Sequence, residues 1–316
     1  MTITTTNALP APVQQWFDNV LLSRPMPKLI HKQMAMKKEL PPNSGRIARY
    51  RRYTNLQTAT VPLPDSGLTP PGQVLNAIDI DARIDFYGTY VTITDQVMFI
   101  NQDPVLNQTV SLLAQSMRET EDELIRNMLA STASVINCTN GVNSDNPTEL
   151  SRPDIDAVVL ALLGNDAMMI SDNIEGSLKF GTAPVREAFW GMMNTAVIDD
   201  LESVVGFISQ AQYPSNQNIL NAEWGSVGNV RFLYSSRGSV SPNASLNGNN
   251  IYNIFVTGQE AYAIVELTTA TASFIYTPPG GPTDPLRRLQ LGAYKFAQVP
   301  RLLNDAWLFN LRATHS

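Results

Sequence analysis

The residues with the clearest chemical potential stand together in the stretch GRIARYRRYTNL, which holds four arginines and two tyrosines: Arg46, Arg49, Tyr50, Arg51, Arg52 and Tyr53. Guanidinium groups bind phosphates and tyrosine rings stack on bases, so one hypothesis is a strand that binds nucleic acid. Arginine also forms bidentate pairs with carboxylates, which suits a contact between protein subunits. Because the side chains of a strand alternate between its faces, these arginines divide between two faces instead of lining one groove. This division favours the subunit contact, and a nucleic-acid-binding module that uses strand 46–53 and the basic N-terminal arm stays as the alternative.

Residue types that support catalysis are scarce or poorly placed. A serine or cysteine nucleophile usually needs a histidine base, and the only histidines, His31 and His315, are expected to be exposed and incidental. Asp79 and Asp81 could bind a metal ion, but they alternate with isoleucines and so indicate the polar face of a strand. Cys138 is the only cysteine, which rules out an internal disulfide or a cysteine-based metal cage. We therefore expect no enzyme, no catalytic residue, no cofactor and no metal site.

The composition points to a protein that packs against other subunits. Of the 316 residues, 43% are hydrophobic and 16% are charged, whereas about 25% are charged in an average soluble domain. No apolar run is long enough to span a membrane, and the N-terminus lacks the pattern of a secretory signal, so we expect no membrane association and no secretion. Residues 1–53 carry a net charge of +7 and the remainder −13, which indicates a basic arm on an acidic body.

The elements that position the arginines are an arm and a long loop. Prolines bracket a short amphipathic helix expected at about residues 13–22, and this arm should dock onto an apolar surface. Residues 46–53 and 78–94 are expected to form two extended limbs, the second with strict alternation of apolar and polar residues. A tip rich in proline and glycine joins the limbs and resists regular structure.

Two helices and an α+β region follow the loop. The longer helix is expected over residues 103–131, capped by Asp103. Beside a charge ladder of Arg118, Asp122 and Arg126 it carries an apolar stripe of Leu106, Val110, Leu113, Met117, Leu124 and Met128. A second helix should begin at Ser151, with a capping-box-like partner in Asp154, and end at Gly164. Short apolar runs then alternate with turns to about residue 276, and the last segment is expected to form a terminal hairpin that turns near Asn304 and Asp305.

This order of segments resembles the major capsid proteins of tailed bacteriophages, which have the HK97-like fold. The local matches include GRIARYRRYTNL leading to PLPDSGLTPPG, then FYGTYVTITD, ETEDEL, NAEWGSVGNVRFLYS and GQEAYAIVEL. These motifs are most similar to one family of such proteins, found in short-tailed and related phages. The resemblance runs from about residue 40 to residue 312, and the order and spacing of the motifs carry it.

The resemblance implies an α+β fold with assigned parts: an N-terminal arm (1–44), an extended β-hairpin loop (45–96), a peripheral domain (97–149 and 277–316) with its spine helix at 103–131, and an axial domain (150–276). It also implies self-assembly through hexamers and pentamers into an icosahedral shell around double-stranded DNA, in the virion of a tailed phage. The expected partners are other copies of the chain, a separate scaffolding protein, a portal protein and a decoration protein, with assembly in the host bacterial cytoplasm. DNA would be enclosed without sequence-specific binding.

Two further expectations concern the subunit contacts. We expect them to involve Trp16 and Phe17 of the arm, Asp65 and Gly67 of the loop tip, and the four arginines Arg46, Arg49, Arg51 and Arg52. No lysine lies between Lys38 and Lys179, so the loop and the long helix cannot supply an amine for lysine–asparagine cross-links. The shell should therefore be held together without covalent bonds.

Overall fold

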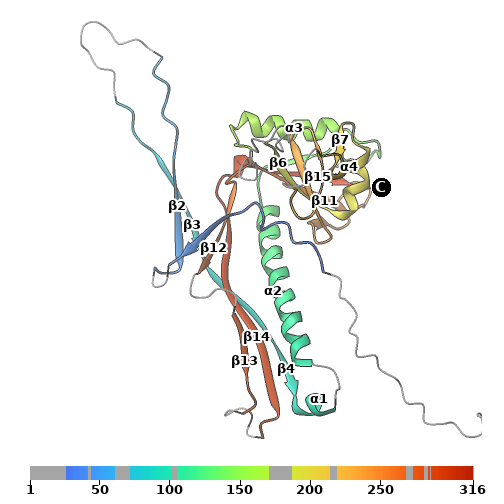
Figure 1. The fold of residues 1–316 in the computed structure, drawn as a ribbon. Helices are drawn as coiled ribbons and strands as arrows, with labels where there is room; N and C mark the ends of the chain where they lie inside the picture. Colours follow the sequence, from blue (N-terminus) through green and yellow to red (C-terminus); the bar gives the residue numbers. More distant parts are fainter. Residues whose placement is uncertain are drawn as a thin grey trace, which may run out of the picture.

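The computed structural model describes residues 26–41, 44–60, 72–100, 105–170, 187–213, 219–267, 273–280, 284 and 286–315. These residues form three parts: a projecting hairpin, a long sheet backed by a long helix, and a compact unit at one end of that helix (Figure 1). The α+β fold class is confirmed. The predicted arm helix at 13–22 and the tip residues Asp65 and Gly67 lie outside the described residues.

The projecting hairpin pairs β2 (Ile47–Tyr53) with β3 (Ala77–Arg83) in antiparallel register. The single limb expected at 78–94 is wrong in one respect, because the chain changes sheet at Ile84. This residue is 2% exposed, and its N–H donates to the Arg46 carbonyl, 3.0 Å away. The following strand, β4 (Asp85–Thr94), joins the long sheet instead.

The long sheet is built around β14 (Leu289–Leu302). One edge of β14 pairs with β4 over ten residues, and the other edge pairs with β13 (Ser273–Thr277) and β12 (Tyr262–Leu267) in turn. β1 (Met36–Leu40) adds a parallel edge strand to β12. Alternation along β14 turns Tyr294 and Phe296 to one face of the sheet, where they pack with Leu113 of the long helix.

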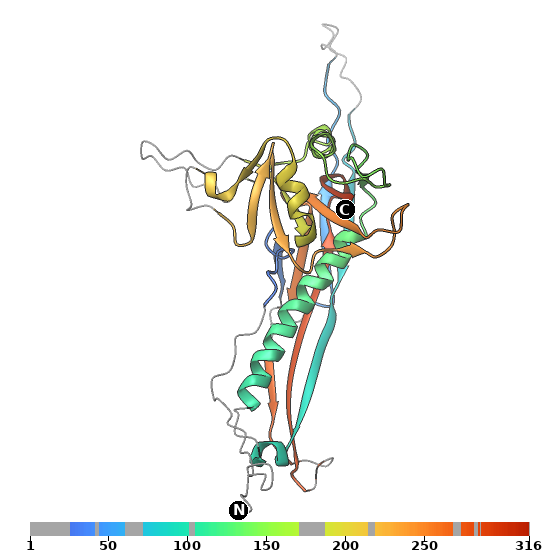
Figure 2. The same cartoon turned by 90° about the vertical axis from the view of Figure 1, so that its right-hand side faces the viewer.

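The predicted long helix is confirmed as α2 (Val105–Ala130), which runs beside the long sheet, after the short helix α1 (Asp95–Ile100) (Figure 2). Leu113 of the predicted stripe is buried, but so are Ile125 and Leu129, which that stripe did not include. The predicted charge ladder is wrong. Asp122 is 2% exposed and bonds to His31 rather than to arginines of its own helix.

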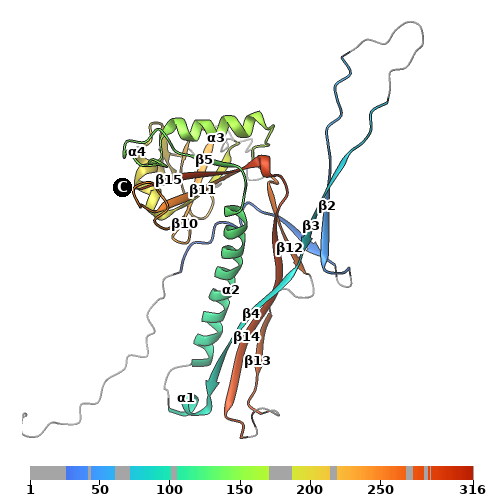
Figure 3. The same ribbon diagram turned by 180° about the vertical axis from the view of Figure 1, so that it is seen from behind.

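The compact unit is a sheet in the order β5-β15-β11-β6-β9-β8-β7, with β10 (Val240–Ser241) beside β11. Its strands are β5 (Val135–Asn137), β6 (Phe189–Asn194), β7 (Phe207–Ser209), β8 (Glu223–Val227), β9 (Val230–Ser235), β11 (Ile251–Thr257) and β15 (Leu308–Thr314). The helices α3 (Arg152–Gly164) and α4 (Ile198–Ser203) complete the unit (Figure 3). Short 3₁₀ turns occur at Thr195–Val197, Gln210–Gln212 and Asp305–Trp307.

Helix α3 has nearly the predicted bounds, but its start differs from a capping box. The Ser151 hydroxyl donates to Asp154 Oδ2, 2.5 Å away, and caps no backbone N–H. Asp154 Oδ1 accepts from the Thr139 N–H and the Asn140 amide instead. The pair therefore anchors the chain that follows β5 to the start of α3.

The predicted terminal hairpin is wrong. The chain does turn after Asn304, but β14 and β15 then belong to different sheets. Leu308, Leu311 and Ala313 are fully buried in β15, and this strand lies between β11 and β5. The apolar residues of β15 thus complete the core of the compact unit rather than pairing with their sequence neighbour.

The two sheets also divide the chain differently from the expected domain boundaries at 97–149 with 277–316 and at 150–276. β5 and β15, expected in the peripheral domain, belong to the compact unit, whereas β12 and β13, expected in the axial domain, belong to the long sheet. The chain crosses between the sheets in the short turns at 258–261 and 303–307, where the Leu303 N–H donates to the Ala261 carbonyl. Tertiary pairing therefore decides the domain membership of these strands.

Candidate interaction surfaces

One face of the hairpin carries a ladder of ion pairs between its own two strands. The register places Arg49 opposite Asp81 and Arg51 opposite Asp79. Arg49 donates from Nε and Nη2 to the two carboxylate oxygens of Asp81, at 2.7 and 2.9 Å. Arg51 contacts Asp79 in the same way and at the same two distances. Arg49 and Arg51 of the predicted contact are thus paired within the chain.

The ladder shifts the titration of its carboxylates. The hydrogen bond from Arg51 lowers the pKa of Asp79, and the one from Arg49 lowers the pKa of Asp81. Both pairs are exposed to solvent, so they add little stability but fix the register of the two strands. The prediction that these aspartates are a polar strand face is confirmed. Among the residues described, no three histidine, cysteine or carboxylate side chains come together as a metal site.

Arg46 and Arg52 differ from the two ladder arginines. Arg46 joins the base of the hairpin to β4, because it donates to the Ile84 carbonyl at 2.7 Å and to Asp85 Oδ1 at 2.6 Å. Arg52 lies opposite Ile78 on the other face and is exposed. Within the described part of the chain it has no ion-pair partner.

Apart from Arg52, the second face of the hairpin is mainly apolar. Near its base, Ala48, Tyr50 and Ala82 pack with Val265 and Ala297 of the long sheet. Beyond this support, the two limbs expose four apolar side chains, of which the neighbours Val74 and Leu75 point to opposite faces. All four are at least 42% exposed: Leu56, Val74, Leu75 and Ile78. The outer limbs stay together through the Thr54 N–H bond to the Asn76 carbonyl and two bonds of 2.8 Å between Gln57 and Gln73. The outer hairpin thus exposes apolar side chains that the rest of the described chain leaves uncovered.

The long sheet has a second uncovered apolar surface on the face opposite α2. Phe86 and Tyr90 of β4 and Ile275 of β13 lie on it, and they are 51%, 66% and 42% exposed. Lys295 from β14 places its ammonium group 4.9 Å from the centre of the Phe86 ring. Large exposed apolar patches of this kind mark contacts between proteins.

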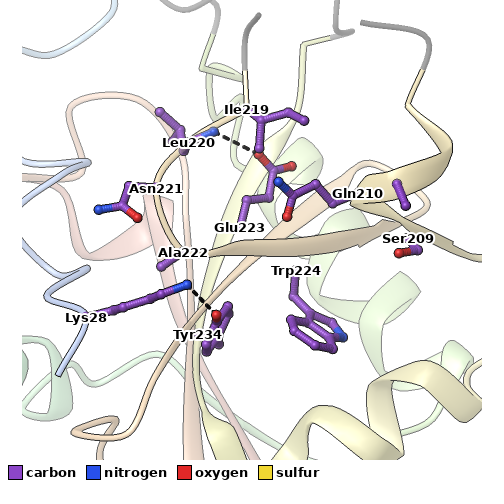
Figure 4. A pocket seen from close by; sticks show the side chains of 11 residues that line it. Lys28, Ser209, Gln210, Ile219, Leu220, Asn221, Ala222, Glu223, Trp224 and Tyr234 are labelled. Atoms are coloured by element: carbon purple, nitrogen blue, oxygen red, sulfur yellow. Dashed lines mark hydrogen bonds between the residues drawn. The ribbon is translucent and has the colours of Figure 1, made fainter. Parts of the chain in front are cut away.

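A cavity of about 730 Å³ lies between β8, β9 and residues 219–222 (Figure 4). Its polar groups are mostly committed to one another. Lys28 bonds to the Tyr234 hydroxyl, and Glu223 accepts from the Leu220 N–H at 3.2 Å. Glu223 also forms a bidentate pair with Arg231, at 2.7 and 2.6 Å. Among the residues described, the charged side chains that line the cavity are therefore paired with neighbouring groups.

Both histidines have partners, so the expectation that they are exposed and incidental is wrong. His31 is 1% exposed, and its Nδ1 lies 2.7 Å from Asp122 Oδ2. His315 lies 3.0 Å from Asp200 Oδ2, and burial raises the pKa of Asp200 despite this contact. The apolar Ile30 beside His31 was the available sequence signal, because it suggests that this stretch is anchored in a core.

The described ranges contain no helix that is long and apolar enough to cross a membrane. Trp16 and Phe17 of the predicted contacts lie outside those ranges, as do Asp65 and Gly67. Of the predicted contact residues, the structure therefore describes only the four arginines. Arg49 and Arg51 lie together on one face of the hairpin, whereas Arg52 lies on the other face and Arg46 at the base.

Comparisons with known proteins agree with one another. A family model described as phage capsid protein matches residues 77–292. The fold is similar to the capsid of Ralstonia phage GP4, at 13% identity and a TM-score of 0.70, over 99% of each chain. It is also similar to the capsid of cyanophage P-SCSP1u, at 13% identity and a TM-score of 0.69, over 100% of this chain and 96% of that one. The head of Helicobacter pylori bacteriophage KHP40 gives 12% identity and a TM-score of 0.65, over 100% and 98% of the chains. A search of curated proteins found no match.

Proposed function

Because the chain belongs to the phage capsid protein family and is a major capsid protein, we propose that its copies assemble through hexamers and pentamers into an icosahedral shell around double-stranded DNA. As a member of this family, the protein is a structural component of a multimeric phage shell. Assembly takes place in the host bacterial cytoplasm, with a scaffolding protein, a portal protein and a decoration protein as partners. The shell subunit acts through its interfaces and has no catalytic role.

The observation that carries this proposal is the set of exposed apolar side chains on the outer hairpin, which the described residues of one subunit leave uncovered: Leu56, Val74, Leu75 and Ile78. Its burial against a neighbouring subunit would remove this surface from water and so favour assembly. Arg49 and Arg51 support the contact indirectly, because their cross-strand pairs hold the hairpin in register. Arg52 is the arginine best placed to meet a carboxylate of a neighbour.

No observation favours the alternative of a nucleic-acid-binding module. The guanidinium groups of Arg46, Arg49 and Arg51 are paired with carboxylates of the same chain. A phosphate would have to displace those carboxylates. We therefore expect weak DNA binding by the purified subunit, without sequence preference, and tight and steeply salt-dependent binding would contradict this.

Electron microscopy of the full-length protein, produced together with its neighbouring phage gene products, tests the proposal. Uniform shells, hexamers or pentamers are expected. The reversed variant Arg49→Glu with Arg51→Glu should block shell formation while the subunit stays folded, and normal shells from it would refute a role for the ladder.

A charge-swapped variant separates pairs within the hairpin from pairs between subunits. Adding Asp79→Arg and Asp81→Arg to the reversed variant restores opposite charges across β2 and β3. Recovery of shells is the expected result, because the ladder lies within one chain. If the swap does not recover them, the arginines act on a neighbouring subunit.

The absence of lysine between Lys38 and Lys179 leads us to propose a shell without covalent cross-links. Purified shells should dissociate to single chains in hot denaturing detergent. A persistent ladder of covalent oligomers on the gel would be incompatible with this proposal.

A further inference from the structure

Residues 28–40, here called the strap, connect all the larger parts of the subunit. At the start of the strap, the Lys28 carbonyl accepts a bond of 2.5 Å from Ser235 in β9. Gln33 donates to the Asn221 carbonyl at 3.3 Å. At its end, β1 pairs with β12 of the long sheet over five residues. The strap thus runs from the compact unit to the long sheet.

The middle of the strap is buried between those two parts. Ile30 is 0% exposed and packs in one apolar cluster with Leu129 of α2, Phe255 of β11 and Tyr262 of β12. This cluster draws its side chains from both sheets and from the C-terminal turns of α2. Ile30 therefore fills the place where the compact unit, the long sheet and the helix meet.

A polar lock holds the strap to α2. The His31 N–H donates to Asp122 Oδ1 at 2.9 Å, and His31 Nδ1 contacts Oδ2 at 2.7 Å, so one carboxylate holds both groups. The hydroxyl of Tyr262 donates to the His31 carbonyl at 2.6 Å. All these side chains are buried, and a buried polar group whose partner is removed is costly. The lock is therefore made only when the strap, α2 and β12 are in their observed places.

Lys32 forms two further ion pairs beside the lock, on its more exposed side. Lys32 lies 3.0 Å from Glu121 Oε2 of α2 and 2.7 Å from Glu266 Oε1 of β12. The ammonium group thus joins the helix and the long sheet directly. It is less buried than His31, so Lys32 can be changed with less risk to folding.

We propose that the strap is a brace that sets the orientation of the compact unit relative to α2 and the long sheet, with the His31–Asp122 pair as its lock. Without the strap, the compact unit is still joined to α2 by residues 131–134, by the Arg237–Glu119 ion pair and by the bond from Arg126 to the Arg237 carbonyl. It is joined to the long sheet by the turns at 258–261 and 303–307 and by the residual cluster around Tyr262. Release of the lock allows the compact unit to rotate. This inference concerns the single subunit and does not depend on the proposed function.

Distance measurements between spin labels on unassembled full-length protein test the brace. Leu160 of α3 is 69% exposed and Thr277 of β13 is exposed, so cysteines at these positions accept labels, whereas the native Cys138 is buried. The parent should give one narrow distance distribution. Asp122→Asn should broaden or shift it, and the neighbouring control Glu123→Gln, which changes an exposed carboxylate of the same helix, should leave it unchanged.

Hydrogen exchange on the same variants supplies an independent readout. Asp122→Asn and His31→Gln should each speed amide exchange in the strap and in β12 by about tenfold or more, with α3 unaffected. If Asp122→Asn does not fold, Lys32→Ala tests the proposal instead, with the same changes expected in the label distances and in the amide exchange of the strap. Unchanged distances and unchanged strap exchange in the folded variants would overturn the proposal, as would faster exchange spread evenly over the whole chain.

Discussion

The buried pair of Glu223 and Arg231 allows a quantitative prediction. The two residues are 2% and 4% exposed. Arg231 donates to both oxygens of Glu223 and lies 4.3 Å from the centre of the Trp190 ring. The same oxygens accept from the Tyr213 hydroxyl at 3.1 Å and from the Leu220 N–H at 3.2 Å. Every charge in this group is therefore compensated in the folded state.

Replacing one partner leaves the other charge buried and alone. Glu223→Leu and Arg231→Met should each lower the free energy of unfolding by about 3–5 kcal/mol. This loss corresponds to roughly two to four powers of ten in the ratio of folded to unfolded protein. The double variant removes both charges and leaves Tyr213 and Leu220 without their acceptor, at about 1 kcal/mol each. It should therefore be more stable than either single variant.

Urea unfolding followed by circular dichroism measures these differences. Tryptophan fluorescence is a less suitable probe, because Trp190 touches Arg231. Asp156→Leu serves as the control, since Asp156 pairs with Arg152 on the surface of α3 and should cost no more than about 1 kcal/mol. Additive costs in the double variant, or a single variant within about 1 kcal/mol of the parent, would refute the reasoning.

Three further predictions concern single features of the fold. Folding lowers the pKa values of Asp79 and Asp81, so the ladder contributes to the stability of the fold above the unfolded pKa of about 3.9, and this contribution is lost as the pH falls through the folded pKa values. NMR titration of the two carboxyl groups should show midpoints below about 3.9. Midpoints at or above that value would contradict the pairing. Gly88→Ala should disrupt β4, because a Cβ there would lie 2.5 Å from the Tyr294 carbonyl oxygen, whereas the same change at Gly164 meets no atom within 4 Å; equal melting temperatures for the two variants would count against this. Burial raises the pKa of the Cys138 thiol, so a thiol reagent should modify it only after denaturation, and rapid labelling of the folded protein would show that β5 opens.

Local sequence patterns predicted the positions of helices and strands better than they predicted which strands pair. The long helix and α3 follow from apolar spacing and from their start and stop residues, and both are present at nearly the expected bounds. The ladder carboxylates follow from alternation along residues 78–85. In contrast, nothing in the sequence of β14 and β15 shows that they separate into two sheets, since pairing partners lie far along the chain.

The partners of the charged residues were also difficult to predict, because they too lie far along the chain. The arginines were identified, but their partners were expected in another subunit because the register of β2 and β3 is a tertiary property. Asp122 looked like a surface residue between two arginines, and only the path of the strap brings His31 to it, 91 residues away in sequence. Polar residues that are buried by distant segments are thus the ones that sequence patterns misplace.

The position of β14 and β15 in their sheets has a consequence for synthesis on the ribosome. β14 pairs with three strands of the long sheet, and β15 lies between β5 and β11 in the compact unit. Residues 289–314 are translated after all of these partner strands, so neither sheet can close before this segment has been made. Nascent chains would expose unpaired strand edges until that point, which makes them candidates for chaperone binding. A subunit with its full set of surfaces would then exist only after residues 289–314 have left the ribosome.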